Sequence, residues 1–279
     1  MADGEITQAE YWNGEAGERW ARNQRVLDAV FAPLTEALFA GADLRPGDAV
    51  LDVGCGAGDT SITAARRVGA EGRVVAADVS GPLLAVARKR SVAAGTAPIA
   101  WIEADAQVED FGEAVVARAI SRFGVMFFDD SVAAFANLRR ALAPGGRLTF
   151  LCWRPLEANA WIAVPRAIVL PLVPVPEPSP PDGPGPFRFA DPEIARSVLA
   201  AAGFREVAVE PVDRPLALGR PEDAAGVVLE LGPVSRLVRE QADSVRDAAR
   251  AAVAAEFAQR AGDGAVSLGA ACWLVSALR

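Results

Sequence analysis

Residues 50–58 read Val-Leu-Asp-Val-Gly-Cys-Gly-Ala-Gly, and this stretch decides the fold. The apolar run 49–53 is short and suits a strand buried on both faces of a parallel sheet. Gly54, Gly56 and Gly58 follow at once, so the backbone can turn sharply and a ligand can approach main-chain amides that a side chain would cover. The stretch predicts a strand that runs into a nucleotide-binding loop.

The spacing of these glycines argues against two common nucleotide-binding loops. A dinucleotide-binding loop reads G-x-G-x-x-G, which from Gly54 would need glycine where Asp59 stands. A P-loop needs Gly-Lys-Ser or Gly-Lys-Thr, and neither sequence follows the glycines. A dinucleotide-dependent reductase stays open as the less favoured alternative, because it would share the fold.

Strands and helices alternate around this stretch. One or two helices are expected within residues 11–40. Downstream, we expect strands at 73–78, 99–103, 115–121 and 147–153 and helices at 60–68, 82–93 and 131–142. Such alternation implies right-handed crossovers and a parallel sheet covered on both faces. Sheets of this kind bind ligands at the carboxyl ends of their strands, where the strand order reverses.

The second half of the chain adds a proline-rich segment and a helical insertion. Residues 171–186 are half proline, so we expect a surface lid or loop there, rather than an interdomain linker. The remaining elements are a helix at 191–202, a strand at 207–210, helical sequence at 221–260 with a break at Gly232-Pro233, and a closing strand at 266–278.

The predicted fold class is α/β. We expect one domain, residues 1–279, built on a doubly wound, Rossmann-like sheet of seven mostly parallel strands, with an antiparallel last strand and a helical lid insertion. Its parts are an N-terminal helical segment (1–45), a nucleotide-binding half (46–155), a proline-rich loop (156–190) and the lid insertion (221–262).

Acidic residues stand at the ends of three successive predicted strands, at Asp52, Asp78 and Asp105. Asp78 comes twenty residues after Gly58, where a carboxylate can accept hydrogen bonds from both hydroxyls of a ribose. Asp105 is placed to accept from the exocyclic amine of adenine, and a helix cap is the equally weighted alternative for it. Three such carboxylates would repel one another without a ligand to bind, so together they indicate an adenosine-containing ligand.

Composition narrows the chemistry further. The chain has 28 basic and 36 acidic residues, a net charge of −8, which argues against a nucleic-acid partner. It has no histidine and no paired cysteines, so we expect no metal site and no histidine base. No uncharged apolar run approaches the roughly 20 residues of a membrane span. The polar, acidic start lacks the features of a secretory signal, so a cytoplasmic location is expected.

Six motifs resemble the class I S-adenosylmethionine-dependent methyltransferases of the ubiquinone-methyltransferase-like type (methyltransferase type 11/25-like). They are YWNGEAGERW, VLDVGCGAGDTS, VVAADVS, EADAQ, SRFGVMFF and LAPGGRLTFLCWRP, within about residues 10–160. The resemblance implies that S-adenosyl-L-methionine is the cofactor and S-adenosyl-L-homocysteine its product. One departure is Arg118, which stands where relatives commonly have aspartate, and it leaves the bounds of the fourth strand open.

The resemblance also implies which residues bind the cofactor. In that family the glycine loop holds the methionine part, the acid after the second strand holds the ribose, and two residues after the third strand hold the adenine. An N-terminal aromatic segment covers the cofactor, although Trp20 is equally suited to the core. The implied cofactor-binding residues are Tyr11, Trp12, Trp20, Asp52, Gly54, Gly56, Asp59, Thr60, Asp78, Val79, Asp105, Ala106 and Ser121.

The methyl acceptor is expected to be a small molecule. Residues clustered after the fourth and fifth strands are predicted to border its pocket, with core packing as the alternative for Phe127 and Phe128. These residues are Arg122, Phe123, Phe127, Phe128, Trp153 and Trp161. Possible acid or base groups are Tyr11, Asp129, Asp130 and Glu157.

Methyl transfer from a sulfonium is an in-line displacement that depends mostly on alignment, so a dedicated base is optional. O- or N-methylation is favoured over attack by an unactivated carbon. Two alternatives stay open: a non-catalytic, S-adenosylmethionine-binding regulatory protein, and a protein or peptide methyltransferase. The sequence leaves the oligomeric state undetermined.

Overall fold

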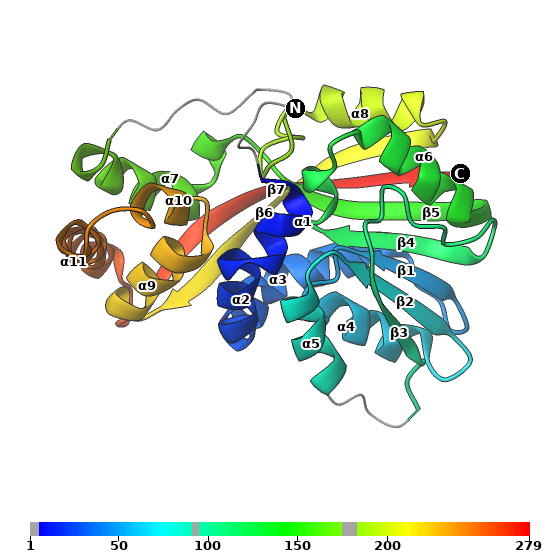
Figure 1. Cartoon of the computed structure of the whole chain (residues 1–279), viewed down its shortest axis with the longest axis horizontal. Helices are drawn as coiled ribbons and strands as arrows, with labels where there is room; N and C mark the ends of the chain where they lie inside the picture. Colours follow the sequence, from blue (N-terminus) through cyan, green and yellow to red (C-terminus); the bar gives the residue numbers. More distant parts are fainter. Residues whose placement is uncertain (1–5, 91–94, 175–182) are drawn as a thin grey trace.

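The computed structural model describes residues 6–90, 95–174 and 183–279. Its centre is a seven-stranded sheet with the order β3-β2-β1-β4-β5-β7-β6 (Figure 1). All neighbouring strands pair in parallel except β7, which is antiparallel to both β5 and β6. The predicted doubly wound α/β fold with an antiparallel last strand is confirmed. The strands are β1 (Ala49–Val53), β2 (Arg73–Asp78), β3 (Ile99–Glu103), β4 (Val116–Arg122), β5 (Leu142–Trp153), β6 (Arg205–Gly219) and β7 (Val266–Leu278).

Helices cover the sheet and extend beyond one end of it. Helices α4 and α5 pack on β1 to β3, α3 packs on β4 to β7, and α6 and α8 pack on each other and on the strands β5 to β7. Helices α7, α9 and α11 contact one another near the long strands β6 and β7 (Figure 1). The α-helices are α1 (Gln8–Asn13), α2 (Glu15–Arg22), α3 (Gln24–Ala42), α4 (Asp59–Val68), α5 (Gly81–Lys89), α6 (Ser131–Ala141), α7 (Ala160–Val169), α8 (Pro192–Ala201), α9 (Pro221–Leu231), α10 (Ser235–Val238) and α11 (Asp243–Arg260).

The strand order reverses between β1 and β4, which are neighbours in the sheet although β2 and β3 separate them in the chain. Right-handed crossovers then place α4 and α5 on one face and the later helices on the other. Leu51 in β1 and Ile120 in β4 are fully buried, as are Phe135 in α6 and Phe150 in β5. The reversal leaves a crevice at the carboxyl ends of these central strands.

The N-terminal helices are tied to the β2–α5 loop. The Asn13 amide donates to the Val79 carbonyl at 2.8 Å, and its oxygen accepts from the Gly81 N–H at 2.9 Å. A Cβ on Gly17 would lie 1.9 Å from the Trp12 carbonyl oxygen and 2.8 Å from Ser80 Oγ. Glycine at this position therefore allows α2 to approach α1 and α5, and α1 and α2 lie directly over the carboxyl end of β2.

Three element boundaries differ from the sequence-based predictions. The strand expected at 207–210 extends over β6, through Pro211 and Pro215, because an edge strand tolerates prolines that a central strand does not. The turn expected at 143–146 belongs to β5, where the pairing with β4 shifts register. The helix expected at 82–93 ends at Lys89, and its last residues fall outside the described chain.

Other expectations concern the fourth strand and the insertion. Strand β4 covers 116–122, close to the predicted 115–121, and Arg118 pairs with Asp43 at 3.4 Å and Asp48 at 3.8 Å. The helical sequence from 221 breaks after Leu231, as the Gly232-Pro233 pair predicts. Part of the proline-rich stretch, residues 175–182, lies outside the described chain. Within the described chain, no helix combines the length and the apolar character of a membrane span.

Candidate active site

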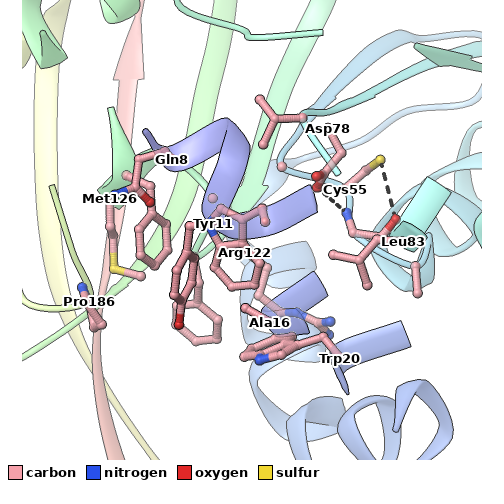
Figure 2. A pocket seen from close by; sticks show the side chains of 18 of the residues that line it. Gln8, Tyr11, Ala16, Trp20, Cys55, Asp78, Leu83, Arg122, Met126 and Pro186 are labelled. Atoms are coloured by element: carbon pink, nitrogen blue, oxygen red, sulfur yellow. Dashed lines mark hydrogen bonds between the residues drawn. The ribbon is translucent and has the colours of Figure 1, made fainter. Parts of the chain in front are cut away.

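A cavity of about 470 Å³ lies at the carboxyl ends of the central strands. This volume is in the range of small-molecule sites, about 300–1,000 Å³. In Figure 2, Asp78, Cys55 and Leu83 lie on one side of the cavity and Met126 and Pro186 on the other. The cavity therefore has a polar end above β1 and β2 and a second, more apolar end.

The glycine loop forms the floor of the polar end. Gly54, Gly56 and Gly58 have φ angles of +69°, +53° and +88°, a region that L-residues with a Cβ rarely adopt. A Cβ on Gly54 would lie 2.7 Å from the Cα of Gly124, whereas a Cβ on Gly56 would meet no heavy atom within 4 Å. Gly56 borders the cavity, so the space that a side chain would occupy is open to a ligand.

Asp78 is held at the end of β2 with both carboxylate oxygens directed by backbone donors. Oδ2 accepts from the Gly56 N–H at 2.7 Å, and Oδ1 accepts from the Ser80 N–H at 2.8 Å. Burial raises the pKa of this carboxyl, and the backbone N–H groups of Ser80 and Gly56 oppose the rise. Each oxygen of a carboxylate has a second lone pair, so Asp78 can accept two further hydrogen bonds from a vicinal diol.

The loop after β3 borders the cavity beside Asp78. Asp105 accepts from the backbone N–H of Gln107 at 2.9 Å, and the Asn137 amide donates to the Ala106 carbonyl at 3.1 Å. Asp105, Ala106 and Val79 all line the cavity. The predicted adenine and ribose residues are therefore brought together at two neighbouring strand ends, those of β3 and β2.

Asp52 and Ser121, in contrast, lie beneath the floor and do not border the cavity. Asp52 is fully buried and accepts from the hydroxyls of Thr60 at 2.6 Å and Ser61 at 2.5 Å. The Ser121 hydroxyl donates to the Val53 carbonyl at 2.7 Å. These side chains hold the glycine loop and the end of β4 in place, so the direct ligand contact expected of them is not available in this structure.

The burial of Asp52 predicts a pH dependence of stability. Burial is the main cause that raises the pKa of Asp52 from 3.8 to about 6. The folded state thus keeps a proton that the unfolded state releases, so this stabilisation is complete below pH 3.8 and is lost as the pH rises to about 6. Urea unfolding gives the free energy of unfolding of the wild type and of Asp52→Asn at each pH. The wild-type value minus the variant value should fall by about 3 kcal/mol between about pH 4 and 7. A difference that does not change with pH would contradict this assignment.

An ion pair separates the two ends of the cavity. Arg122, at the end of β4, donates to Asp59 Oδ2 at 2.7 Å and to the Thr35 hydroxyl. Its guanidinium carbon lies 5.7 Å from the centre of the Phe31 ring. Arg122 thereby links the start of α4 to α3, and it holds the ring of Phe31 beside the glycine loop.

Aromatic side chains form the wall of the apolar end. Phe123 and Trp153 stack with 4.0 Å between ring centroids and 11° between planes, and Phe31 meets the Trp161 ring edge-on at 5.9 Å. The buried Trp161 Nε1 has no hydrogen-bond partner among the described residues. This wall can enclose a planar apolar group, whereas the Trp161 N–H is buried within the wall itself.

Aromatic residues of the N-terminal segment border the cavity. Trp12 meets Trp20 at 5.6 Å and Phe127 at 5.5 Å between ring centroids, and all three residues border the cavity. The Arg236 guanidinium lies 5.0 Å from the centre of the Tyr11 ring, so α10 contacts α1 across the cavity. Phe128 also borders the cavity, while its ring packs edge-on against the core residue Phe135.

The four candidate acid or base groups lie in different surroundings. Tyr11 and Asp129 border the cavity. Asp130 caps α6 by accepting from the Ala133 N–H at 2.9 Å, and Glu157 is exposed in a short 3-10 helix that does not border the cavity. The geometry leaves Tyr11 and Asp129 as candidates, and it does not support a catalytic role for Glu157.

Several cavity residues were missed because they belong to helices that resemble ordinary amphipathic helices. On α3, the residues Gln24, Leu27, Asp28 and Phe31 follow the i, i+3, i+4, i+7 spacing of one helical face, and all four border the cavity. Gln24 and Asp28 are polar residues on an otherwise apolar helical face. This departure from the apolar pattern could have predicted that the face borders a cavity. The segment 230–236 also borders the cavity, through Glu230, Leu231, Gly232, Pro233, Ser235 and Arg236.

The geometry fits an adenosine-containing ligand with a flexible tail. Carboxylates lie at the ends of β2 and β3, and the open backbone of the glycine loop follows β1. Residues that would hold such a ligand are Asp78, Val79, Asp105 and Ala106 for the nucleoside, with Gly54 and Gly56 for the tail. The tail would occupy the open space above Gly56, whose own N–H is already bonded to Asp78.

Comparisons with known proteins agree with this geometry. Residues 50–146 match the family described as "Methyltransferase domain". The ubiquinone/menaquinone biosynthesis C-methyltransferase of Teredinibacter turnerae is 39% identical over 109 residues, which cover 39% of this chain and 44% of the relative. The demethylmenaquinone methyltransferase of Thermus thermophilus is 34% identical over 164 residues, 56% of this chain and 73% of the relative. The chain spans less than half the length of the first curated relatives that it matches.

Solved structures share the fold at low identity. A Haemonchus contortus phosphoethanolamine N-methyltransferase 2 has a TM-score of 0.56 and 14% identity, over 99% of this chain and 60% of that one. The [4+2]-cyclase SpnF has a TM-score of 0.55 and 17% identity, over 98% and 97% of the two chains. Together with the Thermus relative, of which 73% is matched at 34% identity, they establish that the chain belongs to the class I S-adenosylmethionine-dependent methyltransferases.

Proposed function

We propose that this protein binds S-adenosylmethionine and transfers its methyl group to a small molecule held against the aromatic wall. The observation that carries the proposal is the continuity of the cavity. The same cavity contains Asp78 and Asp105 at one end and Trp153 and Trp161 at the other. A cofactor and an acceptor bound at the two ends would meet next to Arg122.

The protein would contribute mainly alignment and a dry pocket. When bound, the cofactor supplies an electrophilic methyl group on a sulfonium. Asp78 and Asp105 would fix the nucleoside, and the aromatic wall would orient the acceptor for in-line attack. The Asp129 carboxylate can receive a proton if the acceptor must lose one, and Tyr11 can do so only as its phenolate.

The segment 230–236 and helices α1 and α2 would cover the bound molecules. Arg236 contacts the Tyr11 ring, so the two covers meet over the cavity. This supports a smaller lid than the sequence suggested, because α11 contributes no residue to the cavity. The expected cytoplasmic location and a partner set limited to small molecules stay predictions.

O- or N-methylation remains the first proposal for the transfer, since no histidine is present to activate a carbon nucleophile. The Teredinibacter relative is named as a ubiquinone/menaquinone biosynthesis C-methyltransferase, and the Thermus relative as a demethylmenaquinone methyltransferase. The aromatic wall would also suit an electron-rich ring, which makes ring C-methylation the second candidate.

The test is transfer of a ¹³C-methyl group from labelled S-adenosylmethionine to a panel of phenols, aromatic amines, quinols and peptides. We expect at least one small aromatic acceptor to be labelled, and the methyl chemical shift then identifies oxygen, nitrogen or carbon. Labelling of peptides alone would favour a protein or peptide methyltransferase. Tight binding of S-adenosylmethionine without transfer to any acceptor would favour the non-catalytic regulatory alternative.

A further inference from the structure

Helix α3 brings a further acidic group to the cavity, outside the strand ends. Asp28 borders the cavity one helical turn after Gln24, with 20% of its side chain exposed. The Gln24 amide donates to Asp28 Oδ2, and the Arg90 guanidinium approaches the same oxygen at 2.9 Å. No described residue forms a hydrogen bond to Asp28 Oδ1. One carboxylate oxygen is thus fixed by the protein, while the other is left for a ligand.

Arg90 connects this carboxylate to the glycine loop. Its Nη1 donates to the Ala57 carbonyl at 2.8 Å, while its Nη2 faces Asp28. The Arg90 guanidinium therefore bridges Asp28 and the glycine loop that forms the floor of the cavity. The nearby Asp59 has its Oδ2 occupied by Arg122 and Thr35, so both carboxylates keep their negative charge close to this part of the cavity.

The strand order shows what part of a bound cofactor reaches this place. The nucleoside residues Asp105 and Asp78 follow β3 and β2, and the next strands in the sheet are β1 and β4. Neighbouring strands lie about 4.8 Å apart. A ligand that starts above β3 and β2 therefore extends its tail over the ends of β1 and β4, which is where Arg90, Asp28 and Asp59 lie.

We propose that Asp28 binds the α-ammonium group of the methionine part of S-adenosylmethionine through its free Oδ1. This inference rests on the proposed function, because it assumes that cofactor. Gln24 and Arg90 position the carboxylate, and the ammonium supplies the donors that Oδ1 lacks. Asp28 is a binding residue in this proposal, and it takes no part in the transfer itself.

The electrostatic surroundings support a cation at this place. Burial raises the pKa of Asp28, the negative charge of Asp59 raises it further, and Arg90 only partly opposes them. A second positive group between the two carboxylates would offset both unfavourable effects. The cofactor ammonium provides such a charge, whereas an uncharged tail does not.

The test combines changes in the protein with deletions in the ligand. Calorimetric titrations would use S-adenosylhomocysteine, its desamino analogue and 5′-methylthioadenosine, which lacks the whole amino-acid tail. Asp28→Asn is expected to weaken S-adenosylhomocysteine binding by about tenfold to a hundredfold, as for a lost hydrogen bond to a charged group. Binding of the other two ligands should change by less than about threefold. Both lack the ammonium group, so the substitution removes no contact with them, and energetic coupling is expected only between groups in contact.

Two variants make the outcome decisive. Glu36→Gln, on the same helix, removes an exposed acid that pairs with Arg67 at 3.0 Å, and it should leave all three affinities unchanged. Asp28→Glu keeps the charge and should retain the preference for S-adenosylhomocysteine over its desamino analogue. Equal weakening of all three ligands by Asp28→Asn, or loss of 5′-methylthioadenosine binding in both Asp28 variants, would assign Asp28 a structural role and overturn the proposal. If the folded wild type binds none of the ligands, the proposed function itself fails.

Discussion

Replacing Asp78 with alanine is expected to weaken the binding of S-adenosylhomocysteine by at least about 100-fold. The change removes a carboxylate whose two oxygens are positioned for two ribose hydroxyls, and each hydrogen bond to a charged group contributes about 1.5–3 kcal/mol. It also removes the acceptor that holds the Gly56 N–H at 2.7 Å, so the glycine loop loses its link to β2. Isothermal titration calorimetry with the purified variant gives the affinity.

The control for this prediction is an acid that lies away from the cavity. Asp110 is exposed and pairs with Arg140 at 2.9 Å, so Asp110→Ala should bind the ligand as the wild type does. Circular dichroism would verify that both variants are folded. If Asp78→Ala kept an affinity within a few-fold of the wild type, the ribose would not be bound at the end of β2.

The second large effect is expected for Gly54→Ala. The φ of +69° costs an L-residue about 1–2 kcal/mol, and the added Cβ would lie 2.7 Å from the Cα of Gly124. Because the opposing atom belongs to the backbone, the glycine loop and the end of β4 must move apart. We expect a total loss of about 2–4 kcal/mol in the free energy of unfolding, measured in urea, and loss of detectable cofactor binding.

Gly47→Ala is the matched control for Gly54→Ala. Gly47 has a similar φ of +85°, but a Cβ there would meet no heavy atom within 4 Å. Its substitution should therefore cost only the backbone strain, about 1–2 kcal/mol, and leave binding intact. Equal losses of stability in the two variants would mean that close packing of Gly54 on Gly124 is unimportant.

The sequence predicted the cofactor half of the fold well because its signals are local. A short apolar run followed by glycines specifies both the strand β1 and the turn after it, and Asp78 follows at a fixed distance in the chain. The same reasoning failed at Pro211, because tolerance of proline depends on whether a strand lies at the edge of the sheet. That position depends on the strand order, which no local pattern contains.

The acceptor half was predicted only in part. Trp153 and Trp161 were found because one ends a predicted strand and the other follows it. Phe31 and Asp28, in contrast, lie on a helix whose apolar face resembles any core-facing surface. Whether such a face packs on the sheet or borders a cavity depends on the neighbouring helices. Glu157 illustrates the opposite error, since a suitable residue type close to a predicted strand end proved to be exposed.

The position of β7 in the sheet has a consequence for biosynthesis. It is the last strand of the chain but lies between β5 and β6, and β6 pairs with β7 alone in the described structure. When residues 205–219 emerge from the ribosome, their future partner has not yet been made, so the edges of both β5 and β6 are unpaired. These two edges must remain apart until residues 266–278 follow. Premature pairing of β5 with β6 is therefore the main misfolding hazard of this topology, and chaperones that shield strand edges would act during that interval.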